Sequence, residues 1–142
     1  MVPDGEVHRN RQEVEGQAVS GALDGLRVVE LGQWVAAPFC ARLLGDFGAE
    51  VLKVELPGGD PSRRAGPFLH DETDPDNSGL FHFVNAGKQG VCADLDDPAQ
   101  LDWLHEQLRG ADVLVENLDP AVRERLGLTF SDLEERHGHL IT

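Results

Sequence analysis

The chain has 142 residues, of which 40% are hydrophobic and 27% charged, and its formal net charge is −14. This length suits one domain with a real core, and the acidic balance argues against a nucleic-acid or anionic-membrane surface, because phosphates would be repelled over most of the protein. No apolar run approaches the ~20 residues of a membrane span, and the N-terminus lacks the apolar region of a secretory signal, so we expect a cytoplasmic protein.

The first third of the chain predicts a βαβ unit behind a flexible polar tail at residues 1–22. Apolar, β-branched residues predict strands over Leu26–Leu31 and Glu50–Glu55. Between them we expect a loop over Gly32–Ala37 and a helix that Pro38 opens and Gly48 ends. The helix places its large apolar residues on one face: Phe39, Leu43, Leu44 and Phe47.

Residues 56–79 are rich in proline, glycine and charge, so we expect no regular element there. A loop of this length in a compact domain is usually functional or disordered. The apolar run Leu80–Val84 predicts a short element that packs this loop back on the core.

The remaining chain continues the alternation of strands and helices. We expect strands over Val91–Leu95 and Asp112–Asn117, with a helix between them that Asp97 caps and Gly110 ends. Three elements are expected after the second of these strands: a helix over Pro120–Leu126, a helix over Ser131–His137 with Ser131 and Glu134 as its capping box, and the start of a fifth strand over His139–Thr142.

This alternation predicts an α/β fold, a parallel sheet with flanking helices and right-handed crossovers. Ligands of such sheets bind at the carboxyl ends of the strands. Here those ends are Gly32–Ala37, the residues from Leu56 onward, Asp94–Asp97 and Asn117–Pro120.

The first loop is the strongest candidate for an anionic ligand, because small residues before Pro38 allow close approach to the amides of a helix start. A tight turn packed for structural reasons alone explains the same residues equally well. Trp34 could stack on a base, although covering the sheet end is the more common role of such a residue. The cations available for phosphate are Lys53, Arg63, Arg64, Lys88, Arg123 and Arg125.

The sequence offers no convincing metal site or nucleophile. Asp94, Asp96 and Asp97 lie close together, but Asp97 is better explained as a helix cap, so we expect no metal. We expect Cys40 and Cys92 to be buried, reduced thiols, because a disulfide framework needs more cysteines.

Three ordered segments resemble the family III CoA-transferases (CaiB/BaiF type), which include formyl-CoA and carnitine CoA-transferases and the α-methylacyl-CoA racemases. They are LDGLRVVELGQWVAAPFCARLLGDFGAEVLKVELPGGDPSRR, NAGKQGVCADLDDP and ADVLVENLDPAVRERLGL, and the similarity runs from Leu23 to the last residue. Residues 23–142 would then be the N-terminal part of a Rossmann-like domain that binds coenzyme A and is cut short at its C-terminal end. The family usually reads A-G-P at Ala36–Pro38 and N-F/Y-x-P-G at Asn117–Ala121.

The resemblance also implies the residues that bind CoA, with Arg125 as the phosphate partner. They are Val35, Ala36, Leu56, Ala93, Asp94, Leu95, Asp96, Asn117, Leu118, Asp119 and Arg125. It implies an interlocked homodimer as well, with an acyl-CoA and a free carboxylic acid as the small-molecule substrates.

In the transferases an aspartate forms an anhydride and then thioester species with CoA, and in the racemases a histidine and an aspartate exchange the α-proton. The resemblance places those residues beyond Thr142, so no catalytic residue is expected in this chain. We therefore expect the CoA-binding segment of a CoA-transferase. The alternatives are a racemase-type enzyme, a catalytically inactive truncated remnant and a standalone nucleotide-binding module.

The partial sheet is expected to leave an apolar edge near Val113 and Ile141, and such an edge pairs readily with another chain. We therefore predict that the 142-residue chain dimerises or aggregates. Light scattering at high protein concentration measures this, and a monodisperse monomer would contradict the prediction.

Overall fold

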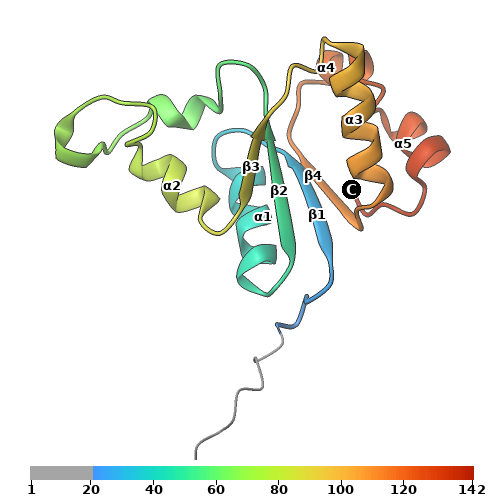
Figure 1. Ribbon diagram of the computed structural model, residues 1–142, viewed down its shortest axis with the longest axis horizontal. Coiled ribbons are helices and arrows are strands. Elements are labelled where there is room, and N and C mark those ends of the chain that lie inside the picture. The colour runs from blue at the N-terminus through green and yellow to red at the C-terminus, as the bar shows by residue number, and fades with distance from the viewer. Residues whose placement is uncertain (1–20) are drawn as a thin grey trace, which may run out of the picture.

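The computed structural model describes residues 21–142, so all but the last two residues of the expected polar tail lie outside the described residues. Strands and helices alternate along the chain (Figure 1). The strands are β1 (Arg27–Leu31), β2 (Glu50–Glu55), β3 (Gln89–Cys92) and β4 (Val113–Glu116). The helices are α1 (Ala36–Asp46), α2 (Gly79–Asn85), α3 (Pro98–Arg109), α4 (Pro120–Arg125) and α5 (Phe130–His137), with short 3-10 helices η1 (Pro61–Arg64) and η2 (Leu69–Asp71).

The strands form one parallel sheet in the order β3-β2-β1-β4, which confirms the predicted fold class. In the register, Val29 of β1 lies beside Leu52 of β2 on one side and Leu114 of β4 on the other. The chain steps from β1 through β2 to β3 in one direction and then returns to place β4 on the far side of β1. The carboxyl ends of β1 and β4 therefore form the topological switch point, the usual ligand position of an open α/β sheet.

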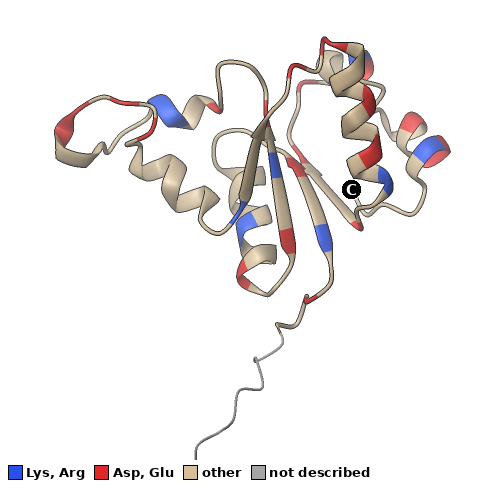
Figure 2. Cartoon of the chain, in the orientation of Figure 1, with Lys and Arg blue, Asp and Glu red and all other residues tan. Residues whose placement is uncertain are grey.

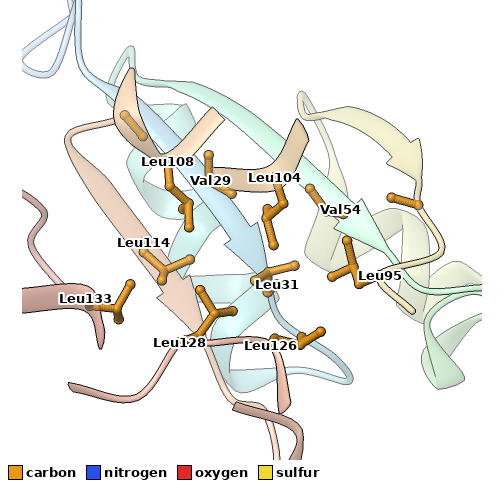
Figure 3. Packing of buried hydrophobic residues seen from close by; sticks show 12 residues of the cluster. Val29, Leu31, Val54, Leu95, Leu104, Leu108, Leu114, Leu126, Leu128 and Leu133 are labelled. Atoms are coloured by element: carbon orange, nitrogen blue, oxygen red, sulfur yellow. The ribbon is translucent and has the colours of Figure 1, made fainter. Parts of the chain in front are cut away.

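Helices cover both faces of the sheet, with α1 and α2 on one side and α3 and α5 on the other (Figure 1). Alternate residues of β1 point to opposite layers, so that Val28 belongs to the core under α1 and Val29 to the core under α3. In the larger core Leu104 and Leu108 of α3 pack against the sheet and meet Leu126, Leu128 and Leu133 (Figure 3).

The apolar face expected for α1 is not its buried face. Ala37, Pro38 and Ala41 are buried against the sheet, and of the large residues only Leu44 packs into this core. Leu43 is 42% and Phe47 is 58% exposed. Small residues let the helix lie close to the strands, which turns its bulky residues outward. Amphipathic spacing alone could not distinguish these two orientations.

Residues 56–79 are more ordered than expected, since η1 and η2 lie within them. Asp60 begins η1 by accepting from the backbone N–H of Ser62 at 2.9 Å, and Pro61 occupies its first turn. The following helix α2 buries Phe81 and Val84, which confirms that the apolar run packs the loop onto the domain.

Helix α5 has its capping box two residues earlier than predicted. Thr129 accepts from the backbone N–H of Asp132, and the Asp132 carboxylate accepts from the N–H of Thr129. The expected fifth strand is a single parallel bridge between Ile141 and Val113. Cys40 and Cys92 are both exposed, contrary to expectation, because Cys40 lies on the outer face of α1 and Cys92 lies on the edge strand β3.

Within residues 21–142 no helix combines the length and apolar character that crossing a membrane requires. Charged residues of both signs are dispersed over the strands and helices (Figure 2).

Two histidines join α3 to α5. His105 Nδ1 lies 3.1 Å from His137 Nε2, and the rings stack with centroids 5.4 Å apart. Burial lowers the pKa of His105, and the nearby Arg136 cation lowers it further. Burial and the neighbouring His105 likewise lower the pKa of His137. The folded protein therefore favours the neutral rings.

We predict a loss of stability as the pH falls from 7 to 5.5. The neutral pair contributes fully above the ordinary histidine pKa of about 6.5, and this contribution is lost as the pH falls toward the lowered folded-state pKa values. Thermal unfolding should show a Tm that falls in this range, and His137→Leu should flatten the dependence. His82→Leu, at an exposed histidine, is the matched control. An equal pH slope in wild type and His137→Leu would contradict the prediction.

Candidate functional site

The carboxyl ends of the four strands form one edge of the sheet, at the top of Figure 1, which we call the carboxyl rim. Two adjacent hollows on it contain residues expected to bind CoA. A small inner hollow is enclosed by residues that include Gly32, Gln33, Leu56, Leu95, Leu118 and Leu126. An open outer cleft of about 370 Å³ is lined by Leu56, Pro57, Asp94, Leu95, Asp96 and Arg125. Leu56 and Leu95 form the wall that the two hollows share.

The outer cleft gathers five of the residues expected to bind CoA: Leu56, Asp94, Leu95, Asp96 and Arg125. Arg125, at the end of α4, forms an ion pair with Asp96, and both side chains are about half exposed or more. Asp94 orders this turn because its carboxylate accepts from the N–H of Asp96 at 3.1 Å. Residues after β2, β3 and β4 thus share one cleft.

The other residues expected to bind CoA do not line this cleft. Leu118 lines the inner hollow. Val35 and Ala36 are exposed at the start of α1, and Asp119 caps α4 through the N–H of Ala121. Ala93 is buried in the core at 3% exposure.

Asn117 acts as a bridge across the switch point. Its Oδ1 accepts from the N–H of Gln33 at 2.8 Å, and its Nδ2 donates to the carbonyl of Gln33 at 2.9 Å. This side chain ties the first loop to the end of β4 beyond the last strand pair, Leu31 with Glu116. It therefore fixes the first loop rather than lining either hollow.

The start of α1 is open toward the rim. Val35 is the N-cap residue, and none of the described side chains caps this end of the helix. A Cβ on Gly32 would lie 2.6 Å from the Ala37 Cβ and 3.0 Å from the Pro38 Cδ, so the close passage of loop and helix requires glycine. Uncapped amides at a helix start favour an anion.

Most of the cations expected to bind phosphate already contact a carboxylate. Lys53 and Lys88 pair with Glu30, while Arg63, Arg123 and Arg125 pair with Glu55, Glu116 and Asp96 respectively. Arg63 also lies over the ring of Phe81, with its guanidinium carbon 3.6 Å from the ring centroid. Arg64 donates to the carbonyl of Gly58. The exposed Arg125 and Arg64 are therefore the cations best placed to meet a ligand.

A buried cluster of four charged side chains, Glu30, Lys53, Asp60 and Lys88, lies beneath the first loop and is here called the charge cluster. Lys53 Nζ is 2.8 Å from Glu30 Oε1 and 3.0 Å from Asp60 Oδ2. Lys88 Nζ is 2.6 Å from the second Glu30 oxygen. Two ammonium groups thus balance two carboxylates.

The environment shifts the pKa of two members of the charge cluster. Burial lowers the pKa of Lys88, although its bond to Glu30 opposes this. For Asp60, burial acts to raise the pKa, but hydrogen bonds from Ser62, Lys53 and the N–H of Trp34 outweigh it and hold the pKa below its ordinary value. Asp60 is therefore ionised at neutral pH.

The sequence alone did not reveal the charge cluster. One signal was present, namely a glutamate and a lysine inside two apolar runs, Glu30 in β1 and Lys53 in β2. A charged residue on a strand covered on both faces requires a partner, and adjacent parallel strands can supply one. Lys88 and Asp60 come from loops whose path the sequence did not predict.

Comparison with known proteins identifies the family. The profile of CoA-transferase family III matches residues 23–142. The chain is 40% identical over 121 residues to succinyl-CoA:mesaconate CoA-transferase of Haloarcula hispanica, covering 85% of this chain and 31% of that protein. It is 38% identical to acetyl-CoA:oxalate CoA-transferase of Acetobacter aceti, covering 85% and 30% respectively.

Comparison with solved structures identifies the same family. The crystal structure of a CaiB/BaiF family protein from Brucella suis has a TM-score of 0.76 and 34% identity, covering 86% of this chain and 32% of that chain. A hypothetical protein of Mycobacterium tuberculosis has a TM-score of 0.73 and 36% identity, covering 85% and 32%. The chain therefore belongs to CoA-transferase family III. It spans about a third of the length of these relatives.

We predict that Lys53→Met lowers the free energy of unfolding by about 3–5 kcal/mol, because it leaves the buried Asp60 carboxylate without an ammonium partner and Glu30 with one of its two. Urea unfolding at pH 7.5 measures this change. Arg64→Met removes an exposed cation from the neighbouring segment and should cost no more than about 0.5 kcal/mol. Equal effects of the two substitutions would show that the charge cluster is not a major source of stability.

Proposed function

We propose that the carboxyl rim binds the coenzyme A portion of an acyl-CoA, and that this chain is the CoA-binding part of an enzyme that moves CoA between an acyl-CoA and a free carboxylic acid. The observation that carries the proposal is the outer cleft, which combines an apolar wall with Arg125 at the carboxyl rim. The names of the matched relatives, which act on succinyl-CoA and acetyl-CoA, support it.

The cleft offers contacts to both the apolar parts and the phosphate groups of CoA. Leu56, Pro57 and Leu95 offer an apolar surface to the adenine ring or the pantetheine arm. Arg125 would exchange its bond with Asp96 for one with a phosphate. This exchange costs little, because an exposed ion pair is worth only about 0–1 kcal/mol. The uncapped start of α1 adds unpaired amides on the same rim.

We assign no catalytic role to the rim carboxylates. Asp119 is engaged as the cap of α4, and Asp94 is engaged in the turn that precedes α3. Among residues 21–142, no group of three or more metal-ligating side chains is placed to hold a metal ion. The resemblance to the transferases implies that the bond-forming aspartate lies beyond Thr142, and we further propose that the whole enzyme is a cytoplasmic homodimer.

Calorimetric titration of CoA into the 142-residue chain tests the proposal. We expect micromolar affinity in the wild type and at least tenfold weaker binding in Arg125→Ala, because a hydrogen-bonded charge contact contributes about 1.5–3 kcal/mol. AMP should bind more weakly than CoA if the pantetheine arm contacts the rim.

Arg109→Ala is the matched control. Arg109 ends α3, is exposed and pairs with a glutamate, as Arg125 pairs with an aspartate, but it lies at the amino side of the neighbouring strand β4. Its substitution should leave CoA affinity unchanged. Equal affinity of wild type and Arg125→Ala would remove the phosphate role of Arg125, and failure of the wild type to bind CoA would contradict the proposed function.

A further inference from the structure

The charge cluster holds the first loop at two points and the first turn of α1 at a third. Lys53 Nζ donates to the carbonyl of Gly32 at 2.9 Å. Asp60 Oδ1 accepts from the backbone N–H of Trp34 at 3.1 Å. Lys88 Nζ donates to the carbonyl of Pro38 at 2.7 Å. The contacts fall at the beginning, the middle and the end of residues 32–38.

The residues that hold the loop and the residues that the loop presents lie on opposite sides of it. Glu30, Lys53 and Asp60 are 0%, 1% and 2% exposed, and of these three only Asp60 reaches the wall of the small inner hollow. Trp34 and Val35, in contrast, are 52% and 45% exposed. None of the four members of the charge cluster lines the outer cleft, so the cluster can affect a ligand there only through the position of the backbone.

The conformation of Trp34 requires support from its surroundings. Its φ of 64° lies in the left-handed region, which costs a bulky residue about 1 kcal/mol or more. The only side-chain contact of the Trp34 N–H among the described residues is with Asp60. Asp60 thus stabilises a backbone conformation that Trp34 disfavours.

Asp60 also belongs to the second segment of the rim. Its own N–H donates to Glu55 Oε2 at 2.9 Å, and the intervening residues include Leu56 and Pro57 of the outer cleft. A single buried carboxylate is therefore bonded to the first loop and anchored at the end of β2. This arrangement sets the position of one segment relative to the other.

We propose that Asp60 is a positioning residue: through the charge cluster it fixes the first loop against the segment after β2 and so shapes the site that the ligand meets. The part of this inference that concerns the ligand rests on the proposed CoA binding. The part that concerns the loop does not depend on it.

Amide hydrogen exchange measured by NMR tests the loop directly. In the wild type the Trp34 amide should exchange at least tenfold more slowly than in an unstructured peptide. Asp60→Ala should remove most of this protection, and Asp60→Asn should keep part of it, because the asparagine Oδ1 can still accept the bond while its Nδ2 replaces the oxygen that faces the Lys53 ammonium. The amide of Asp112, which donates to the carbonyl of Arg27, reports whether each variant remains folded.

Asp76→Asn is the matched control, since it neutralises an exposed carboxylate that pairs with Arg63 in the same region, residues 56–79, and makes no bond to Asp60 or to the first loop. It should leave the exchange of Trp34 unchanged. An unprotected Trp34 amide in the wild type would overturn the proposal, even if Asp60→Ala failed to fold. Unchanged protection in a folded Asp60→Ala variant would overturn it equally.

The affinity of the same variants for CoA tests the consequence. We expect Asp60→Ala to bind CoA about tenfold more weakly than the wild type, Asp60→Asn to bind with intermediate affinity, and Asp76→Asn to bind within threefold of the wild type. Unchanged affinity in Asp60→Ala with a mobile loop would show that loop position does not matter to the ligand. If the wild type binds no CoA, the proposed function fails, while hydrogen exchange still decides the role of Asp60.

Discussion

Four buried charges placed beneath a loop constrain the rest of this domain. A single ammonium or carboxylate taken out of water costs several kcal/mol, so each member of the charge cluster depends on the others. Glu30 lies on β1, Lys53 on β2, and Asp60 and Lys88 in the segments that follow β2 and α2. Satisfying all four requires these segments to meet at the carboxyl end of the sheet, and this is the end where an open α/β fold presents its ligand.

The same constraint determines which charges remain for a ligand. Lys53 and Lys88 are buried against carboxylates and cannot neutralise a phosphate. In the sequence alone they were candidates for phosphate binding. With a net charge of −14 the protein as a whole repels anions. Binding of CoA would therefore depend on local groups: an arginine released from a weak surface pair, the uncapped amides of α1 and an apolar wall. Such a site selects ligands by shape and short-range contacts rather than by long-range attraction.

The sequence predicted the elements of the fold better than their orientation. Strand and helix periodicity, Asp97 with Pro98, and the glycines after the helices led to the parallel sheet that the structure has. Periodicity could not show that α1 buries Ala37 and Ala41 and exposes Phe47, since this depends on how closely the helix approaches the strands. Local pattern also placed the capping box of α5 two residues late, because two serine or threonine residues compete for the same role there.

The candidate site was predictable as a set of strand ends but not as a set of contacts. The cleft brings Asp94 and Arg125 together as the family resemblance implied, whereas Asn117 is occupied by the backbone of Gln33 and Ala93 is buried. The charge cluster depends on two loops, and the sequence carries little information about loop paths. Long-range pairing of this kind follows from the tertiary fold rather than from spacing along the chain.

Amide chemical-shift mapping during a CoA titration is the most direct test of the account, because it shows where on the domain the ligand binds. The account predicts that the largest shifts fall at the carboxyl rim, at Gln33, Leu56, Asp94 and Asp96, and that the amino ends of the strands, at Arg27, Glu50 and Gln89, change little. Shifts concentrated at the amino ends, or no residue-specific shifts at saturating CoA, would contradict it.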